Sequence, residues 1–299
     1  MAATDIIIDC DPGIDDALAL ALAVASPELR LLAVTCVAGN RPVETTRLNA
    51  RGLLNLFGAS TVPVYAGAAA PLNGTEARVN LVHGEDGLGG VEVDRSGPLS
   101  DIHGADALSD ALLGDGGTDL TIVAIGPLTN LARAELKQPG VLARARAILI
   151  MGGAVNHPGN VTPFGEFNFW ADPQAAEVVA RSGARLGIFP LDVTSQAAMT
   201  PAWLRQLAGW PSKSAQALSA MLRVYGALDP LLHDPCPVAY LIDPTLFDGE
   251  AGDLQVEWRS TAEEGRCHFR RETSDTTVFF TTNQEKLLGV IAARLATLP

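Results

Sequence analysis

Four carboxylates stand within eight residues near the start of the chain, at Asp9, Asp11, Asp15 and Asp16. So many like charges repel one another unless a positive group lies among them. Calcium or magnesium is the simplest such group, because both ions prefer oxygen ligands. The alternative is a solvated turn in which one aspartate caps a helix, the usual role of an Asp-Pro-Gly sequence. Capping needs only one carboxylate, so the group of four favours a metal site.

The residues around these carboxylates predict a strand, a turn and a helix. An apolar run at 6–8 precedes them, Pro12 and Gly13 lie among them, and an alanine- and leucine-rich segment at 17–25 follows. Further buried strands are expected at 31–37, 62–65, 120–125, 147–151 and 186–191. Helices are expected at 43–57, 105–113, 129–137, 173–181 and 285–296, with an interrupted helical region at 201–241. Apolar strands separated by helices imply a mainly parallel central β-sheet flanked by helices, a Rossmann-like α/β fold.

The last third of the chain adds three strand-like segments, expected at 254–258, 267–271 and 276–280, which predict a small antiparallel addition near the C-terminus. No shift of composition and no Pro/Ser-rich linker marks a boundary, so residues 1–299 are expected to form a single domain. Ligands bind outside the carboxyl ends of the strands in parallel sheets. Polar or glycine-rich clusters follow several of the predicted strands, which places the carboxylates at such an edge.

Two long stretches carry no regular pattern, at 67–99 and 154–172. The first is rich in glycine and polar residues and includes His83. A loop of that length inside a compact domain is usually functional, often as a lid, and ordinary disorder is the alternative.

Composition excludes several classes of protein. The net charge of −13 argues against nucleic acid or an anionic membrane as the main partner. The sequence has no run long and apolar enough for a membrane span and no apparent signal peptide. The four cysteines are far apart with no Cys-x-x-Cys pair, which indicates reduced thiols rather than zinc ligands. We therefore expect a cytoplasmic protein with no membrane association.

Several motifs resemble, in the same order along the chain, those of the inosine–uridine-preferring nucleoside hydrolases. Together they extend over about four-fifths of the sequence. They lie at residues 9–17, 37–40, 83–84, 126–130, 151–153, 166–168, 172–173 and 233–236. One Asp-rich turn is weak evidence, whereas several motifs in order are specific.

The resemblance implies the nucleoside hydrolase fold and a calcium ion at the strand ends. In this sequence Asp11, Asp16 and Asp234 would bind calcium through side chains, and Ile125 through its backbone carbonyl. Asp9 would support the turn by hydrogen bonds. By the resemblance, Asp15, Asn160, Glu166 and Asn168 would hold the ribose hydroxyls, Asn40 would lie near the sugar or the metal, and Met151 would also bind substrate.

The implied reaction is hydrolysis of a ribonucleoside to ribose and free base. Cleavage of a glycosidic bond builds positive charge on the sugar, which carboxylate and amide oxygens favour. A metal lowers the pKa of bound water, and a ligating carboxylate can take its proton. Asp11 is therefore expected to act as the base in one inverting step.

Three aromatic residues are candidates for contact with the nucleobase. His233 directly precedes Asp234 and is expected to protonate the leaving base, although a histidine beside Asp-Pro is often a structural turn residue. His83 either contacts substrate or lies on a mobile surface. Tyr225 matches a tyrosine of pyrimidine-preferring relatives, and core packing on an amphipathic helix is its alternative.

The sequence is also compatible with other functions. Asp9 and Asp11 after an apolar strand also resemble the nucleophile motif of haloacid-dehalogenase-like phosphatases, which bind magnesium, but the three lysines have no fitting context. The acidic run lacks the glycine and glutamate of an EF-hand. A nucleoside-binding protein without catalysis is the third alternative. The resemblance implies a homodimer or homotetramer, and the sequence does not rank the nucleobases.

Overall fold

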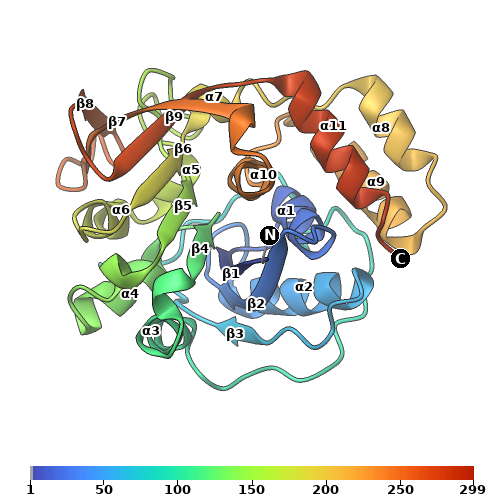
Figure 1. Cartoon of the computed structure of the whole chain (residues 1–299), viewed down its shortest axis with the longest axis horizontal. Helices are drawn as coiled ribbons and strands as arrows, with labels where there is room; N and C mark the ends of the chain where they lie inside the picture. Colours follow the sequence, from blue (N-terminus) through green and yellow to red (C-terminus); the bar gives the residue numbers. More distant parts are fainter. Residues whose placement is uncertain (1–2) are drawn as a thin grey trace.

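The computed structural model describes residues 3–299, and their nine strands form one sheet (Figure 1). The strand order across the sheet is β3-β2-β1-β4-β5-β6-β9-β7-β8. The strands are β1 (Thr4–Cys10), β2 (Leu29–Cys36), β3 (Val64–Ala66), β4 (Thr121–Ala124), β5 (Ala147–Met151), β6 (Leu186–Phe189), β7 (Phe247–Val256), β8 (Cys267–Arg271) and β9 (Thr276–Thr282). The predicted α/β fold with a mainly parallel sheet is confirmed.

Strand direction changes only at the C-terminal end of the chain. From β3 to β9, neighbouring strands in the sheet pair in parallel. β7 is antiparallel to both β9 and β8. β9 therefore joins the antiparallel addition to the parallel part of the sheet, and β7 begins seven residues earlier than position 254, where the sequence pattern placed it.

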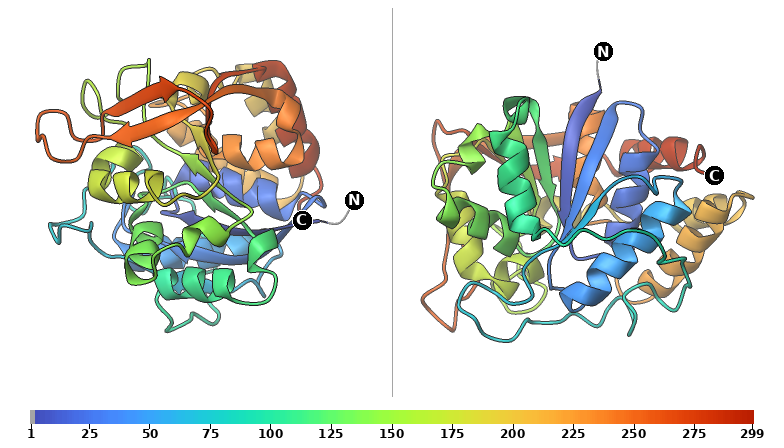
Figure 2. Two further views of the ribbon diagram at one scale, coloured as in Figure 1. Left: turned by 60° about the vertical axis from the view of Figure 1, so that its left-hand side comes forward. Right: turned by 90° about the horizontal axis from the view of Figure 1, so that it is seen from below.

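Eleven α-helices of the described residues cover the two faces of the sheet (Figures 1 and 2). Their bounds are α1 (Ile14–Val24), α2 (Val43–Leu56), α3 (Gly104–Leu113), α4 (Thr129–Lys137), α5 (Phe167–Ala171), α6 (Pro173–Ala180), α7 (Leu191–Thr194), α8 (Pro201–Ala208), α9 (Lys213–Tyr225), α10 (Pro235–Ile242) and α11 (Gln284–Leu295). Short 3₁₀ turns lie at Gly117–Asp119, Leu142–Arg144 and Pro244–Leu246.

The side chains of β1 point alternately to the two faces of the sheet, and each face has its own hydrophobic core. Ile6 and Ile8 pack in a core that includes α1, α2, α9, α10 and α11, whereas Ile7 packs in the core formed with α3, α4 and α6. Successive side chains of a strand point to opposite faces, so both faces of β1 are apolar. All three isoleucines are buried. The polar residues that follow β1 are consequently held at the strand end by apolar packing on both sides.

The stretch at 67–99 contains no helix or strand, as its composition indicated. It packs along α2, where the Asn55 side chain donates to the backbone carbonyls of Asp94 and Ser96, both at 2.8 Å. The Asn49 side chain donates to the carbonyl of Asp86 at 2.9 Å and that of Pro12 at 3.2 Å. These contacts attach the loop to the turn after β1.

Among residues 3–299, no helix has the length and apolar character needed to cross a membrane. The four cysteines, Cys10, Cys36, Cys236 and Cys267, are all buried and unpaired.

Candidate active site

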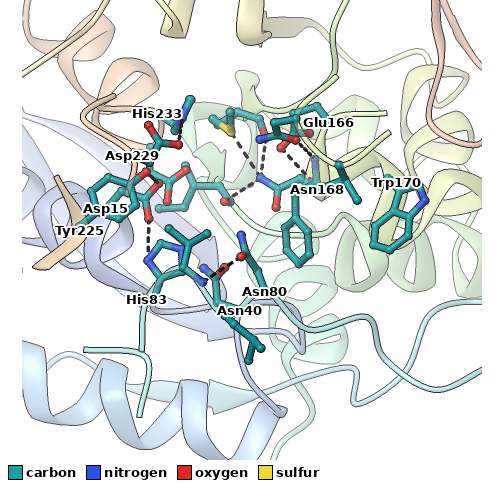
Figure 3. A pocket seen from close by; sticks show the side chains of 18 of the residues that line it. Asp15, Asn40, Asn80, His83, Glu166, Asn168, Trp170, Tyr225, Asp229 and His233 are labelled. Atoms are coloured by element: carbon teal, nitrogen blue, oxygen red, sulfur yellow. Dashed lines mark hydrogen bonds and ion pairs between the residues drawn. The ribbon is translucent and has the colours of Figure 1, made fainter. Parts of the chain in front are cut away.

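A cavity of about 450 Å³ opens at the carboxyl ends of the parallel strands (Figure 3). Eleven of the thirteen residues predicted for the site line it. They are Asp15, Asn40, His83, Ile125, Met151, Asn160, Glu166, Asn168, Tyr225, His233 and Asp234. The two others, Asp11 and Asp16, are buried and do not line the cavity. Both are hydrogen-bonded to Asn40, which does: its backbone N–H donates to Asp11 Oδ2 at 2.6 Å, and its side-chain amide donates to Asp16 Oδ2. The fold thus brings together residues from position 11 to position 234.

The turn after β1 is closed by Asp16. Its Oδ2 accepts from the backbone N–H of Gly13 at 2.8 Å and from the Asn40 side chain at 3.1 Å. Its Oδ1 accepts from the backbone N–H of Asp11 at 3.2 Å. The N-cap residue of α1 is Gly13, and Asp16, three residues further along the chain, accepts from the Gly13 N–H as in a capping box. The helix-cap role considered as the alternative to metal binding is therefore present in part, and these contacts also fix the direction of the Asp16 carboxylate.

Three buried carboxylates of the described residues lie close enough together to hold a metal ion. Oxygen atoms of Asp15, Asp16 and Asp234 all lie within 4.8 Å of one another. Asp15, which the resemblance placed on the ribose, belongs to this cluster. Asp11, which the resemblance placed on the metal, is not in this set of three; Asn40 holds its Oδ2, and its Oδ1 is buried without a partner.

The cluster and the neighbouring Asp11 together have the properties of a cation site. Burial, with the nearby carboxylates adding to it, raises the pKa of Asp11 and Asp234 well above the usual range, and burial raises that of Asp16 to about 7. Asp11 Oδ1 is buried without a hydrogen-bond partner. Because unpaired buried anions are costly and all donors are oxygens, the set fits a hard divalent cation.

Two glycines leave room for the Asp11 carboxylate. A Cβ atom at Gly126 would lie 2.5 Å from Asp11 Oδ1, and one at Gly39 would overlap Asp11 Oδ2. Gly39 and Gly126 follow β2 and β4, the two neighbours of β1 in the sheet. Any larger residue at these positions would displace Asp11.

Asp9 lies outside the cavity and holds the strands together. It is fully buried, and its Oδ1 accepts from the Thr35 hydroxyl and from the Asn130 side chain, the latter at 2.8 Å. Burial raises its pKa to about 7, and these two hydrogen bonds oppose the rise.

The wall on the side of β5 is built around Glu166 and Asn168. Glu166 caps α5, and its carboxylate accepts from the backbone N–H groups of Gly153, Asn168 and Phe169. The Asn168 amide donates to the carbonyls of Ile125 at 3.0 Å and Met151 at 3.1 Å. Both amide hydrogens are therefore used, which leaves the Asn168 Oδ1 as an acceptor. The helix α5 was absent from the sequence expectation because five residues give no helical period.

Asn160 is attached to the same wall. Its Oδ1 accepts from the backbone N–H of Phe167 at 3.0 Å, which orients its amide nitrogen as a donor. The side chain lines the cavity.

His83 and Tyr225 stack on each other beside Asp15 (Figure 3). Their ring centroids are 5.3 Å apart, and both side chains are buried. The Tyr225 hydroxyl donates to Asp15 Oδ2 at 3.4 Å. Burial lowers the pKa of His83, and its Nδ1 accepts from the backbone N–H of Ile14 at 3.1 Å. The imidazole is thus neutral with its proton on Nε2.

His233 is held at both ring nitrogens. Nδ1 lies 2.8 Å from the Thr194 hydroxyl, and Nε2 lies 3.3 Å from Asp229 Oδ2. Burial lowers the pKa of His233, but Asp229, Asp15 and Glu166 outweigh burial and raise it. A raised pKa suits a group that must give up a proton near neutral pH.

Sequence reasoning missed two groups at this site. Thr194 and Asp229 contact His233, and the only signal was the spacing of Asp229 four residues before it. The mouth of the cavity is lined by Val79, Leu81 and Trp170, which lie in stretches without a motif. The Arg78 guanidinium stacks 4.1 Å from the Trp170 ring and pairs with Glu264 at 2.6 Å, which fixes one edge of that mouth.

The fold and the cavity together define an α/β protein with an acidic pocket, whose carboxylates could hold a metal ion, at the carboxyl ends of parallel strands. The model of the inosine-uridine preferring nucleoside hydrolases matches residues 6–289. The chain belongs to this family.

Individual relatives agree with this assignment. The inosine-uridine preferring nucleoside hydrolase of Leishmania major is 36% identical, covering 87% of this chain and 85% of its own. A pyrimidine-specific ribonucleoside hydrolase of Shewanella is 34% identical, covering 97% and 96%. A structure of the purine-preferring ribonucleoside hydrolase from Gardnerella vaginalis superposes with a TM-score of 0.92 at 30% identity, covering 98% of both chains.

These relatives confirm the predicted enzyme class, an N-glycosidase of the inosine–uridine-preferring type. They do not share a base preference, since one is named pyrimidine-specific and another purine-preferring at similar identity.

Proposed function

We propose that this chain is a calcium-dependent ribonucleoside hydrolase, which cleaves purine or pyrimidine ribonucleosides to ribose and free base. The observation that carries the proposal is the floor of the cavity. There Asp15, Asp16 and Asp234 converge, and a buried oxygen of Asp11 has no partner. Membership of the family supplies the substrate class.

Calcium would be held by the side chains of Asp11, Asp16 and Asp234 and by the carbonyl oxygen of Ile125. The Asn168 amide donates to the Ile125 carbonyl at 3.0 Å, and this hydrogen bond fixes the direction of the carbonyl. When bound, the ion supplies positive charge that lowers the pKa of water. The all-oxygen donor set favours calcium over zinc.

The ribose would lie between Asp15 and the wall formed by Asn160, Glu166 and Asn168, with Asn40 and Met151 beside it. These side chains line the cavity and offer mostly acceptors. Acceptors suit a diol, whose hydroxyls donate, and they stabilise the positive charge that develops on the sugar as the bond breaks. Ribonucleosides are therefore preferred over deoxyribonucleosides.

In the reaction, Asp11 takes a proton from a water molecule whose oxygen forms the new bond to C1′. The bond from C1′ to the base nitrogen breaks, and its electron pair leaves with the base. His233, protonated on both ring nitrogens, donates the Nε2 proton to that base and keeps the Nδ1 proton, which faces the Thr194 hydroxyl, so both products leave neutral. The attack comes from the face opposite the base and inverts the anomeric carbon.

The nucleobase would lie against His83, Tyr225 and His233. The Nε2–H of His83 is a fixed donor, and the stacked rings give an apolar face. This combination accepts more than one base, so purine and pyrimidine ribonucleosides are both candidate substrates.

The geometry gives no support to the phosphatase alternative. Asp9, its nucleophile, is fully buried and hydrogen-bonded to Thr35 and Asn130 outside the cavity. The three lysines are exposed, and none lines the cavity.

We propose the whole chain as one functional unit, because the site draws on residues 11 to 234. The four buried, unpaired cysteines support a cytoplasmic location. A homodimer or homotetramer remains our expectation, which light scattering after size exclusion tests.

Proton NMR tests the reaction directly. With inosine or uridine and calcium we expect free base and ribose, with the α-anomer appearing first. Early accumulation of the β-anomer would contradict inversion, and binding without release of ribose would indicate a non-catalytic nucleoside-binding protein.

A further inference from the structure

His233 has an unexplained partner in Asp229, a residue with no assigned role. Asp229 lines the cavity, and its side chain is 29% exposed, whereas that of His233 is 7% exposed. Both side chains line the cavity, and Asp229 is the more exposed of the two. Figure 3 shows the two side chains together at one end of the pocket, away from Asn80 and Trp170.

Backbone hydrogen bonds hold the segments that carry His233 and Asp229. The segments around Thr194 and His233 pair as a short ribbon, in which Leu232 N–H donates to Ala197 at 2.9 Å and Met199 N–H donates to Pro230 at 2.8 Å. This ribbon presents the Thr194 hydroxyl to Nδ1 of His233.

Asp229 itself is fixed from the opposite side. Its backbone N–H donates to the carbonyl of Tyr225 at 2.8 Å, at the end of α9. Its Oδ1 accepts from the backbone N–H of Leu231 at 3.0 Å. Only Oδ2 is left to face the histidine, so the carboxylate cannot rotate away without losing a hydrogen bond.

An ionised carboxylate only accepts hydrogen bonds, so Nε2 must carry the hydrogen in this contact. Burial alone would raise the pKa of Asp229, but the hydrogen bond and charge of His233 lower it on balance, which supports the ionised form. At 3.3 Å the contact is at the long end of the hydrogen-bond range. A basic ring nitrogen of a substrate can therefore compete for the same hydrogen.

We infer that Asp229 is a positioning residue for the leaving base: its Oδ2 holds the Nε2 hydrogen of His233 at the cavity wall until a nitrogen of the base displaces the carboxylate and takes that hydrogen. The inference rests on the proposed function, and specifically on His233 as the proton donor. Asp229 acts through His233 and forms no bond in the reaction.

The variant Asp229→Asn tests this role with the side-chain shape retained. Since Leu231 N–H requires an acceptor, the amide turns its NH₂ toward Nε2, a donor where an acceptor is needed. Two substrates separate the effects: inosine, whose base leaves poorly without a proton, and p-nitrophenyl riboside, whose leaving group needs none. Asp248→Asn, an exposed position on β7, is the matched control for the charge change.

We expect Asp229→Asn to lower kcat for inosine roughly 10-fold or more and to change p-nitrophenyl riboside turnover by less than about 3-fold. The double variant with His233→Ala should lose no more than His233→Ala alone, because Asp229 acts through that ring. Equal losses on both substrates, or losses that add in the double variant, would overturn the inference. Wild-type protein that cleaves neither substrate would overturn the proposed function instead, and the inference with it.

Discussion

The backbone N–H of Ile14 donates to Nδ1 of His83 at 3.1 Å, although 69 residues separate them. Ile14 is the first residue of α1, whose leading N–H groups have no partner within the helix. A side chain from the long loop at 67–99 therefore completes the helix that carries Asp15 and Asp16. The loop is part of the site's construction as well as of its rim.

His83→Ala should weaken both the fold and substrate binding. The Ile14 N–H would be left buried without its acceptor, and Tyr225 would lose its stacking partner. We expect the free energy of unfolding to fall by about 1–3 kcal/mol in urea titrations, and KM for nucleosides to rise more than kcat falls. Unchanged stability would show that this contact does not anchor the loop.

Calcium should stabilise the folded protein, and the Asp16 carboxylate should be needed for this effect because it is a proposed calcium ligand. Binding only to the folded state adds about 2.7 kcal/mol at a concentration of 100 times Kd. We expect a calcium-dependent rise of Tm in the wild type and in Asp248→Asn, a smaller rise with magnesium, and little rise in Asp16→Asn. A Tm that calcium raises equally in Asp16→Asn and the wild type would remove Asp16 from the ligand set.

The metal-free protein should lose stability as the pH rises from about 4 to about 7. The pKa of Asp9 is about 7 in the folded chain and about 3.9 when unfolded, so the folded state binds the extra proton in this window. Asp9→Asn cannot ionise and keeps an acceptor for Thr35 and Asn130.

In denaturant titrations with EGTA, Asp9→Asn should match the wild type at about pH 4 and exceed it by about 1–3 kcal/mol above pH 7. The sign is the test: a variant that becomes relatively less stable as the pH rises would mean that ionised Asp9 stabilises the fold.

Asp11→Ala should abolish ribose release without unfolding the chain. Removal of a general base costs roughly 10²-fold or more, and Asp11 has few hydrogen bonds to lose. Circular dichroism checks the fold and a reducing-sugar assay checks turnover. Appreciable residual activity would refute Asp11 as the base.

The sequence predicted helices and strands well where the hydrophobic period is clear and turn residues mark both ends. The helix at 129–137 and the strand at 147–151 have the expected bounds. β7 was expected too late because its first five residues, apart from Phe247, are exposed and do not alternate.

The site was harder to predict than the fold. The residue motifs identified the cavity lining, but hydrogen bonds between distant segments leave no local pattern. Thr194 and Asp229 were missed for that reason. The sequence also did not show that Asp15 contacts both Tyr225 and the other carboxylates of the acidic cluster.

The most direct test of the account is a reducing-sugar assay on inosine, uridine, cytidine, adenosine and guanosine, each with calcium and with EGTA. We predict ribose release from at least one ribonucleoside, lost with chelator and restored by calcium. No ribose from any of the five, together with turnover of p-nitrophenyl phosphate, would contradict the proposed function.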